Sequence, residues 1–311
     1  MRYAIISDIH GNLPALNAVI DDANRSFIDE YIFIGDYYGD LAYPNEVVNT
    51  IKNIKGAHVI KGNKENYLDS LLNSDQTEWV YDQFAPLYWN YKELTDDNLQ
   101  YLIGLPEDKK IKTPNGNLKM HLFHASAFLF KSTNMGLLSS SKYAEKMIQE
   151  NFSHEEYLCY VQKILSSDDK IVEILDGLDT DIVIFGHSHI QWHAEINKKV
   201  IINPGSCGLP LDYDKRAAYT ILELDENAIN ILERRVPYNI SDTICYTMKS
   251  ELYINSKIWC DIIFDQLNLA KEEITFFFRH VETIAKKKND YIRPYSTTVW
   301  NEAANSWKID Q

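Results

Sequence analysis

The chain opens with an apolar segment, residues 3–6, that runs directly into the sequence SDIHGN at residues 7–12. Asp8 and His10 stand two residues apart, and side chains at that spacing on an extended backbone point to the same side. After Asn12, a suitable helix N-cap, apolar residues recur at helical spacing. The stretch therefore predicts a strand, a loop with two potential metal ligands and a helix, with the chemistry at the carboxyl end of the strand.

Four more clusters of potential ligands follow, each after an apolar or β-prone run. They are Gly35-Asp36, Gly62-Asn63, His124, and His187 with His189. Taken singly, each has an ordinary interpretation as a turn, a cap or a core histidine. Together with Asp8 and His10 they place two Asp, one Asn and four His at strand ends. Two divalent cations that share a carboxylate account for such a set, and mixed nitrogen and oxygen ligands suit Mn, Fe, Zn or Ni.

The order Asp-x-His, Gly-Asp, Gly-Asn, His and Gly-His-x-His resembles the calcineurin-like metallophosphoesterase superfamily, in particular its branch of small bacterial and archaeal phosphodiesterases. The segment NPGS at residues 203–206 and the strand-like residues from Arg216 resemble further parts of that branch. The resemblance covers about residues 1–240. It implies an α/β fold, the four-layer α/β/β/α metallophosphoesterase sandwich, with the metals at the carboxyl ends of the strands.

The resemblance also implies a ligand for each motif. One ion would be bound by Asp8, His10 and His189, the other by Asn63, His124 and His187, with Asp36 as the bridge. The implied cofactors are two divalent ions from among Mn, Fe, Zn, Ni and Mg, and the sequence does not determine which. A hydroxide that bridges two such cations would attack phosphorus near neutral pH, because coordination lowers the pKa of water to about 7.

Three residues of the set are candidates for a direct catalytic role. Asn63 can contact a phosphate oxygen through its amide, and Lys64 can neutralise developing charge as a point cation. Many family members carry His where this chain has Lys64, so the source of the leaving-group proton stays open. A solvated lysine at a loop is the alternative for Lys64, and His10 is the alternative proton donor, although a ligand role fits it better.

The segments around residues 203–206 and Arg216 have simpler interpretations. We expect residues 203–206 to form a tight turn that packs under the metal loops, with a supporting role for the ligands as the alternative. For Arg216 we expect a structural ion pair rather than a substrate contact.

Composition limits the partners. The formal net charge is −14, and nearly all of it belongs to residues 1–240, because residues 241–311 carry nine basic and ten acidic residues. Long nucleic acid needs several cations on one surface, so a small phosphate ester is the expected substrate. The apolar runs are too short for a membrane span, and the start does not resemble a signal peptide. The four cysteines lack paired spacing, so we expect free thiols and a cytoplasmic location.

The chain divides into an expected catalytic domain, residues 1–240, and a helical C-terminal extension, residues 241–311. Within the first, residues 111–124 predict a hairpin that turns at residues 114–117, and residues 126–178 predict a helical insertion. The extension has apolar stripes that need a partner. Packing on the sandwich, roofing the site and forming a homo-oligomer all stay open.

The leading interpretation is a dinuclear metal-dependent phosphoesterase, and Lys64 in place of His favours a phosphodiesterase. A phosphomonoesterase, a phosphoprotein phosphatase and a dinucleoside-polyphosphate hydrolase of the same superfamily are the alternatives among enzymes. A non-catalytic metal-binding scaffold on this fold is the alternative of another class. The complete ligand set argues against the scaffold.

Overall fold

The fold is built on two five-stranded sheets in a computed structural model, which describes the chain except for residues 76, 78, 80–82, 114, 115, 117, 126–132, 226, 227 and 308–311. The first sheet contains β1 (Arg2–Ile6), β2 (Glu30–Phe33), β3 (His58–Val59), β9 (Ala217–Leu224) and β10 (Ile229–Val236), in the order β10-β9-β1-β2-β3. The second contains β4 (Asp108–Lys112), β5 (Lys119–Phe123), β6 (Ile182–Ile184), β7 (Gln191–Ile196) and β8 (Lys199–Pro204), in the order β4-β5-β6-β8-β7.

Each sheet contains three adjacent parallel strands. Strands β1, β2 and β3 run parallel in the first sheet, and β5, β6 and β8 run parallel in the second. Antiparallel strands lie outside them, namely β9 and β10 in the first sheet and β4 and β7 in the second. Parallel strands bring their carboxyl ends to one edge, so the loops after them meet there.

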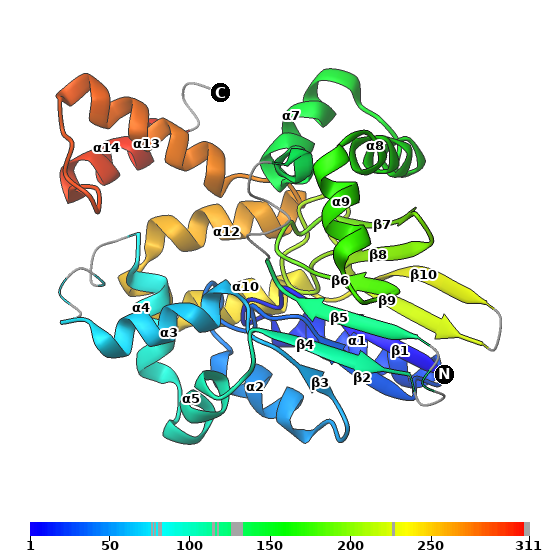
Figure 1. The fold of residues 1–311 in the computed structure, drawn as a ribbon. Helices are drawn as coiled ribbons and strands as arrows, with labels where there is room; N and C mark the ends of the chain where they lie inside the picture. Colours follow the sequence, from blue (N-terminus) through cyan, green and yellow to red (C-terminus); the bar gives the residue numbers. More distant parts are fainter. Residues whose placement is uncertain are drawn as a thin grey trace.

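Helices cover the outer face of each sheet (Figure 1). Those that follow the first sheet's strands are α1 (Leu13–Arg25), α2 (Pro44–Asn53), α3 (Asn63–Asn73), α4 (Ala85–Glu93) and α5 (Asp96–Ile103). The inserted region before β6 contains the short 3-10 helix η1 (Asn134–Leu138), α7 (Ser140–Glu150), α8 (His154–Ser167) and α9 (Asp169–Gly177). The C-terminal helices are α10 (Ile240–Lys249), α11 (Glu251–Asn255), α12 (Lys257–Leu269), α13 (Ile274–Lys288) and α14 (Thr297–Ser306).

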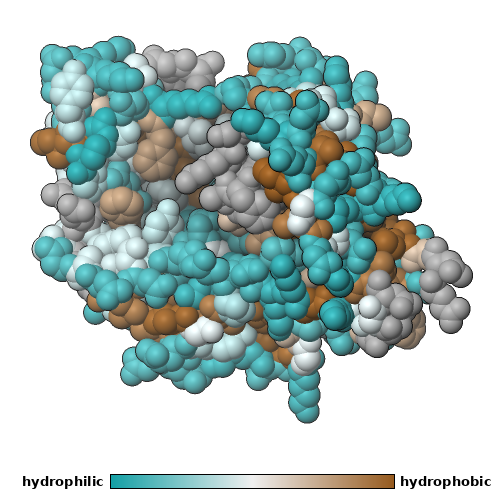
Figure 2. Space-filling model, in the orientation of Figure 1, coloured by the Kyte–Doolittle hydropathy of each residue, from teal (hydrophilic) through white to brown (hydrophobic). Residues whose placement is uncertain are grey.

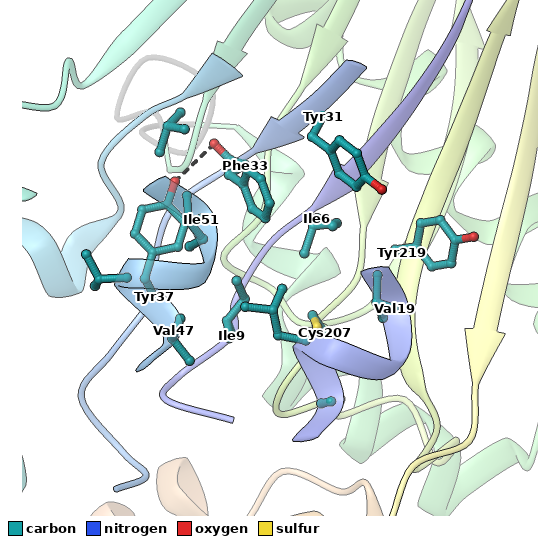
Figure 3. Close-up of a cluster of buried hydrophobic side chains, with 14 of the residues drawn as sticks. Ile6, Ile9, Val19, Tyr31, Phe33, Tyr37, Val47, Ile51, Cys207 and Tyr219 are labelled. Carbon is teal, nitrogen blue, oxygen red and sulfur yellow. Dashed lines mark hydrogen bonds between the residues drawn. The ribbon is translucent and has the colours of Figure 1, made fainter. Parts of the chain in front are cut away.

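Three apolar cores separate the four layers. One lies between the first sheet and its helices, where Ile6 and Phe33 meet Val19 and Val47 (Figure 3). A second fills the space between the sheets, and a third lies between the second sheet and α7–α9. Alternate residues of β1 face opposite cores, because side chains alternate along a strand. The four-layer α/β/β/α sandwich predicted from the sequence is therefore confirmed.

The predicted hairpin is formed by β4 and β5, which pair antiparallel, although three of its four expected turn residues lie outside the described part. The helical insertion is present from residue 133 to residue 178, and its first residues, 126–132, are not among those described. The C-terminal region is helical as expected. The division at residue 240 stays a prediction.

Hydrophilic residues cover most of the face in Figure 2, with hydrophobic residues in smaller patches among them. In the described part of the chain, none of the helices is long and apolar enough to cross a membrane. All four cysteines are free, two of them buried and two exposed.

Candidate metal centre

The ligand loops leave their strands with a strained backbone. Asp8, His10, Asp36, His187 and His189 all have positive φ, between 54° and 72°. Residues other than glycine rarely adopt this left-handed conformation, and it costs of order 1 kcal/mol or more at each position. Strain at five of the seven predicted ligands indicates that the surrounding fold holds these side chains in place for a function.

The first predicted ligand set converges on one point. Nε2 of His10 lies 3.1 Å from Nε2 of His189, and Oδ1 of Asp8 lies 3.2 Å from the same His189 nitrogen. The other Asp8 oxygen, Oδ2, accepts hydrogen bonds from Ser7 Oγ at 2.6 Å and from the backbone N–H of His187 at 3.1 Å. Oδ1 is buried and accepts no hydrogen bond from the described residues. A buried carboxylate oxygen that faces two imidazole nitrogens fits a bound cation.

The second predicted set lies beside the first. Oδ1 of Asn63 lies 3.0 Å from Nε2 of His124 and 2.9 Å from Nδ1 of His187. Oδ2 of Asp36 lies 3.5 Å from Nε2 of His124. The bridge predicted at Asp36 stays a prediction, and Asp8 also lies near both sets, because its Oδ1 lies 3.8 Å from the same nitrogen of His124.

Three of the imidazoles are oriented by a hydrogen bond at the ring nitrogen that faces away from the centre. Nδ1 of His124 bonds the carbonyl of Ile34 at 2.6 Å, and Nδ1 of His189 bonds the carbonyl of Leu209 at 2.7 Å. Nδ1 of His10 lies 2.7 Å from Oδ2 of Asp40. Such partners fix the tautomer so that Nε2 keeps its lone pair for a metal, and histidine ligands have them as a rule.

The buried carboxylates of the centre favour positive charge on the groups beside them. Burial raises the pKa of Asp36, but His124 and His10 outweigh burial and lower it to about 2. Burial lowers the pKa of His124, yet Asp36 and Asp8 raise it to about 10. The pKa of His10 rises to about 9, because Asp40 and Asp8 outweigh the effect of burial. Without metal, the carboxylates thus hold protons on two imidazoles, and divalent cations would satisfy the same demand.

Lys64 faces the centre from the first turn of α3. Its side chain is only 13% exposed, and its Nζ lies 2.9 Å from Oδ2 of Asp40. Its backbone N–H donates to Oδ1 of Asp36 at 2.8 Å. Burial lowers the pKa of Lys64, but Asp40 and Asp36 more than offset burial and raise it. Lys64 is therefore a fixed cation at the site, and the interpretation as a solvated loop lysine does not fit its position.

Two residues at the centre escaped the sequence analysis. Asp40 is buried and joins His10 to Lys64. Trp259 of α12 donates from Nε1 to Oδ1 of Asp40 at 2.9 Å. Asp40 follows the second motif by a few residues, so its position was a usable signal. Trp259 carried none, because it is one aromatic among many in an amphipathic helix.

The turn at residues 203–206 packs under the ligand loops, as expected. Nδ2 of Asn203 donates to the carbonyl of Gly186 at 2.9 Å, and Oγ of Ser206 donates to the carbonyl of Asp8 at 2.6 Å. Arg216 forms an ion pair with Asp214, which confirms its structural role.

The centre forms the floor of a cavity of about 400 Å³. His10, Asp36, Asn63, His187 and His189 line it from the sandwich, together with Asp40 and Lys64. Residues of η1, α7, α12 and the start of α13 form the remaining walls. The C-terminal extension therefore both packs on the sandwich and roofs the site.

Known proteins resemble this chain over most of its length. The family model of the calcineurin-like phosphoesterase superfamily domain matches residues 1–227. An uncharacterized protein of Methanocaldococcus jannaschii is 28% identical over 268 residues, which make up 80% of this chain and 93% of that protein.

Two solved structures share the fold. A metallophosphoesterase from Sphaerobacter thermophilus superposes with a TM-score of 0.58 at 22% identity, over 87% of this chain and 99% of that one. A hypothetical protein from Pyrococcus horikoshii gives a TM-score of 0.54 at 19% identity, over 83% and 97% of the two chains. The family match ends before α10, so the helices that roof the cavity lie beyond it.

Proposed function

Because the chain belongs to the calcineurin-like phosphoesterase superfamily, we propose that it is a dinuclear metal-dependent phosphodiesterase that acts on small phosphate esters. One observation carries the proposal. Two adjoining ligand groups, Asp8-His10-His189 and Asp8-Asp36-His124, meet at a buried carboxylate oxygen that accepts no hydrogen bond from the described residues. Two divalent cations held there would lower the pKa of a bound water and polarise the phosphoryl oxygens.

The residues around the ligand groups have separate roles in this proposal. Asn63 holds its amide between His124 and His187, where it can orient both a metal and a phosphate oxygen. Lys64, held in place by Asp40, can donate a hydrogen bond from its Nζ to the leaving oxygen. Asp40 keeps Nε2 of His10 directed at the centre, so His10 acts as a ligand in preference to a proton donor.

The charge at Lys64 favours a diester over a monoester. A monoester dianion brings one more negative charge than a diester, and it would gain most from a free cation beside the metals. The ion pair with Asp40 already neutralises Lys64. A singly charged diester therefore matches the site better. The cavity of about 400 Å³ lies within the range that small-molecule sites occupy, which supports a small substrate.

The direct test compares two chromogenic esters. Protein stripped with EDTA is refilled with Mn, Ni, Zn or Mg, and release of p-nitrophenolate is measured from bis-p-nitrophenyl phosphate and from p-nitrophenyl phosphate. We expect metal-dependent release that is faster from the diester. Faster release from the monoester, or none from protein that holds two ions, would contradict the proposal.

Two variants and one control sharpen the test. Asp36→Asn should lower the number of ions bound per chain, whereas Asp22→Asn, at a carboxylate that pairs with Arg234, should leave it unchanged. Lys64→Met should slow diesters with a poor leaving alcohol more than those that release p-nitrophenolate, because a poor leaving group develops more charge. An equal effect on both classes would remove Lys64 from the leaving-group role.

A further inference from the structure

The roof of the cavity contains a buried carboxylate that the proposed reaction does not use. Glu272 lies in the linker between α12 and α13, is only 4% exposed, and lines the cavity whose floor is the metal centre. In a site for phosphate esters, a carboxylate that binds no metal would repel the negatively charged substrate. The carboxylate therefore calls for an explanation.

Neutral donors leave Glu272 with spare capacity. Ser140 Oγ donates to its Oε2, and the backbone N–H of Thr275 donates to its Oε1 at 2.9 Å. A carboxylate offers about four acceptor sites, so two of them remain. Among the described residues, Glu272 has no ion pair with a basic side chain. The neighbouring Glu273, by contrast, pairs with Lys271 at 3.1 Å.

Capping of α13 accounts for only part of this arrangement. The bond from Thr275 satisfies one N–H in the first turn of the helix, and a carboxylate at this position is mildly stabilising. A glutamine would accept from the same N–H through its oxygen and could donate to the hydroxyl oxygen of Ser140 through its amide nitrogen. The cap therefore explains a hydrogen-bond acceptor at residue 272 but not a negative charge inside the cavity.

The other charged groups that line the cavity have partners of opposite charge. Lys64 is neutralised by Asp40, and the negative ligands on the floor are matched by the metals that they would hold. Glu272 then remains as a carboxylate that no basic side chain of the described residues pairs, in the same cavity as the predicted metal ligands. A buried charge that no protein group pairs is costly, and a cationic ligand would remove that cost.

We propose that Glu272 is a specificity-determining residue, which selects a phosphate ester whose organic arm carries a protonated amine. The phosphate lies on the metal floor and the ammonium group donates to the free acceptor sites of Glu272. An arm with a second phosphate, as in a dinucleoside polyphosphate, is disfavoured by repulsion. The inference rests on the proposed function, because it requires the phosphate at the metal centre.

Phosphonates test this selection without turnover, because the carbon–phosphorus bond is not an ester bond. Metal-loaded protein is titrated by calorimetry with aminoalkylphosphonates of two, three and four methylene groups, and with alkylphosphonates in which a methyl replaces the amine. We expect at least one amine to bind roughly tenfold tighter than its methyl counterpart, a difference of about 1.4 kcal/mol. Glu272→Gln should abolish the preference without weakening the methyl compounds.

Glu273→Gln is the matched control, because Glu273 is equally buried but is paired and does not line the cavity. It should keep the preference for the amine. An equal affinity for amine and methyl compounds in the native chain, or a preference that survives Glu272→Gln, would overturn the proposal. Equal gains from hydroxyalkylphosphonates and aminoalkylphosphonates would also overturn it, since the selection would then be for any donor.

The experiment separates this inference from the proposed function. If no phosphonate binds to metal-loaded protein and no ester is hydrolysed, both fail together. If phosphonates bind without discrimination while diesters are hydrolysed, only the role of Glu272 fails. If the amine preference is found but no ester is hydrolysed, the recognition stands and the catalytic proposal fails.

Discussion

The substitution Asp40→Asn tests whether the metal centre depends on its supporting hydrogen bonds. Asp40 accepts from Nδ1 of His10 at 2.7 Å and from Nζ of Lys64 at 2.9 Å through one oxygen, and from Nε1 of Trp259 at 2.9 Å through the other. Asparagine has a single acceptor oxygen, so its amide group must face one of these three donors. It also carries no charge to hold His10 and Lys64.

The expected loss of stability follows from the hydrogen bonds that no longer have a charged acceptor. Burial raises the pKa of Asp40, but Lys64 and His10 outweigh it and hold the pKa well below the usual range, so the carboxylate is ionised. A hydrogen bond to a charged group contributes about 1.5 kcal/mol at least, and two of them weaken. We expect the free energy of unfolding of the metal-free protein to fall by about 3 kcal/mol.

Metal binding should weaken as well, because His10 loses the partner that orients its ring. Changes at such supporting groups cost about 10- to 100-fold in metal affinity, or about 1.4 to 2.8 kcal/mol. Urea unfolding in EDTA measures the first effect, and competition against a chromogenic chelator measures the second. Only one of the two proposed ions should be weakened strongly, because in the described part of the chain Asp40 bonds only His10 among the four predicted histidine ligands.

Asp22→Asn is the control for a general loss of stability. Asp22 accepts a hydrogen bond from Tyr219 and pairs with Arg234, and neither partner is a predicted ligand. This variant should lose stability and keep both metal affinities. If folded Asp40→Asn protein binds both ions as tightly as the native chain, the argument that Asp40 positions His10 is wrong.

Three further predictions concern other parts of the molecule. In Gly186→Ala, the new Cβ would lie 2.1 Å from Ser7 Oγ, so metal content measured by atomic absorption should fall, whereas Gly177→Ala, with open space around it, should bind metal normally; equal metal content in both would contradict this. Burial raises the pKa of Glu233, but bonds from two histidines outweigh it and lower the pKa from 4.5 to about 2, so its stabilisation is present above pH 4.5 and is lost as the pH falls toward 2. As the pH falls over that interval in EDTA, the free energy of unfolding should decrease by up to about 3 kcal/mol less in Glu233→Gln than in the native chain. An equal decrease in both proteins, measured by urea unfolding at each pH, would refute the assignment. Trp300→Ala removes a side chain that is 1% exposed between two aromatic rings, so it should lower the free energy of unfolding by about 3–5 kcal/mol, and a loss below 1 kcal/mol would show that the C-terminal helices contribute little.

The sequence predicted the fold and the meeting of the potential ligands at one edge, because both depend on local patterns. Each potential ligand follows a short β-prone run, and parallel strands deliver the residues after them to the same edge. The structure accordingly brings Asp8, Asp36 and His124 together, although they lie far apart in the chain. Their assignment as ligands stays a prediction that metal analysis of the variants can test.

The sequence could not show how the ligands are supported. Asp40 gained its role only when the fold placed Lys64 and His10 within reach of one carboxylate. The position of Asp8 and Asp36 near both ligand groups likewise depends on distances of a few ångströms. Such distances follow from packing and loop conformation, and no periodic pattern encodes them.

The C-terminal extension, residues 241–311, shows most clearly what the sequence determines and what only the tertiary structure decides. Its apolar stripes predicted helices that need a partner, and the sequence alone determined that much, since helix formation is governed by local spacing. Only the tertiary structure decided that α12 packs through Cys260 and Ile263 against Leu41 and Leu209 and so carries its residues over the metal centre. An apolar stripe fixes that a surface must be buried but not which surface buries it, because hydrophobic attraction has no direction and the choice depends on the shape of the assembled fold.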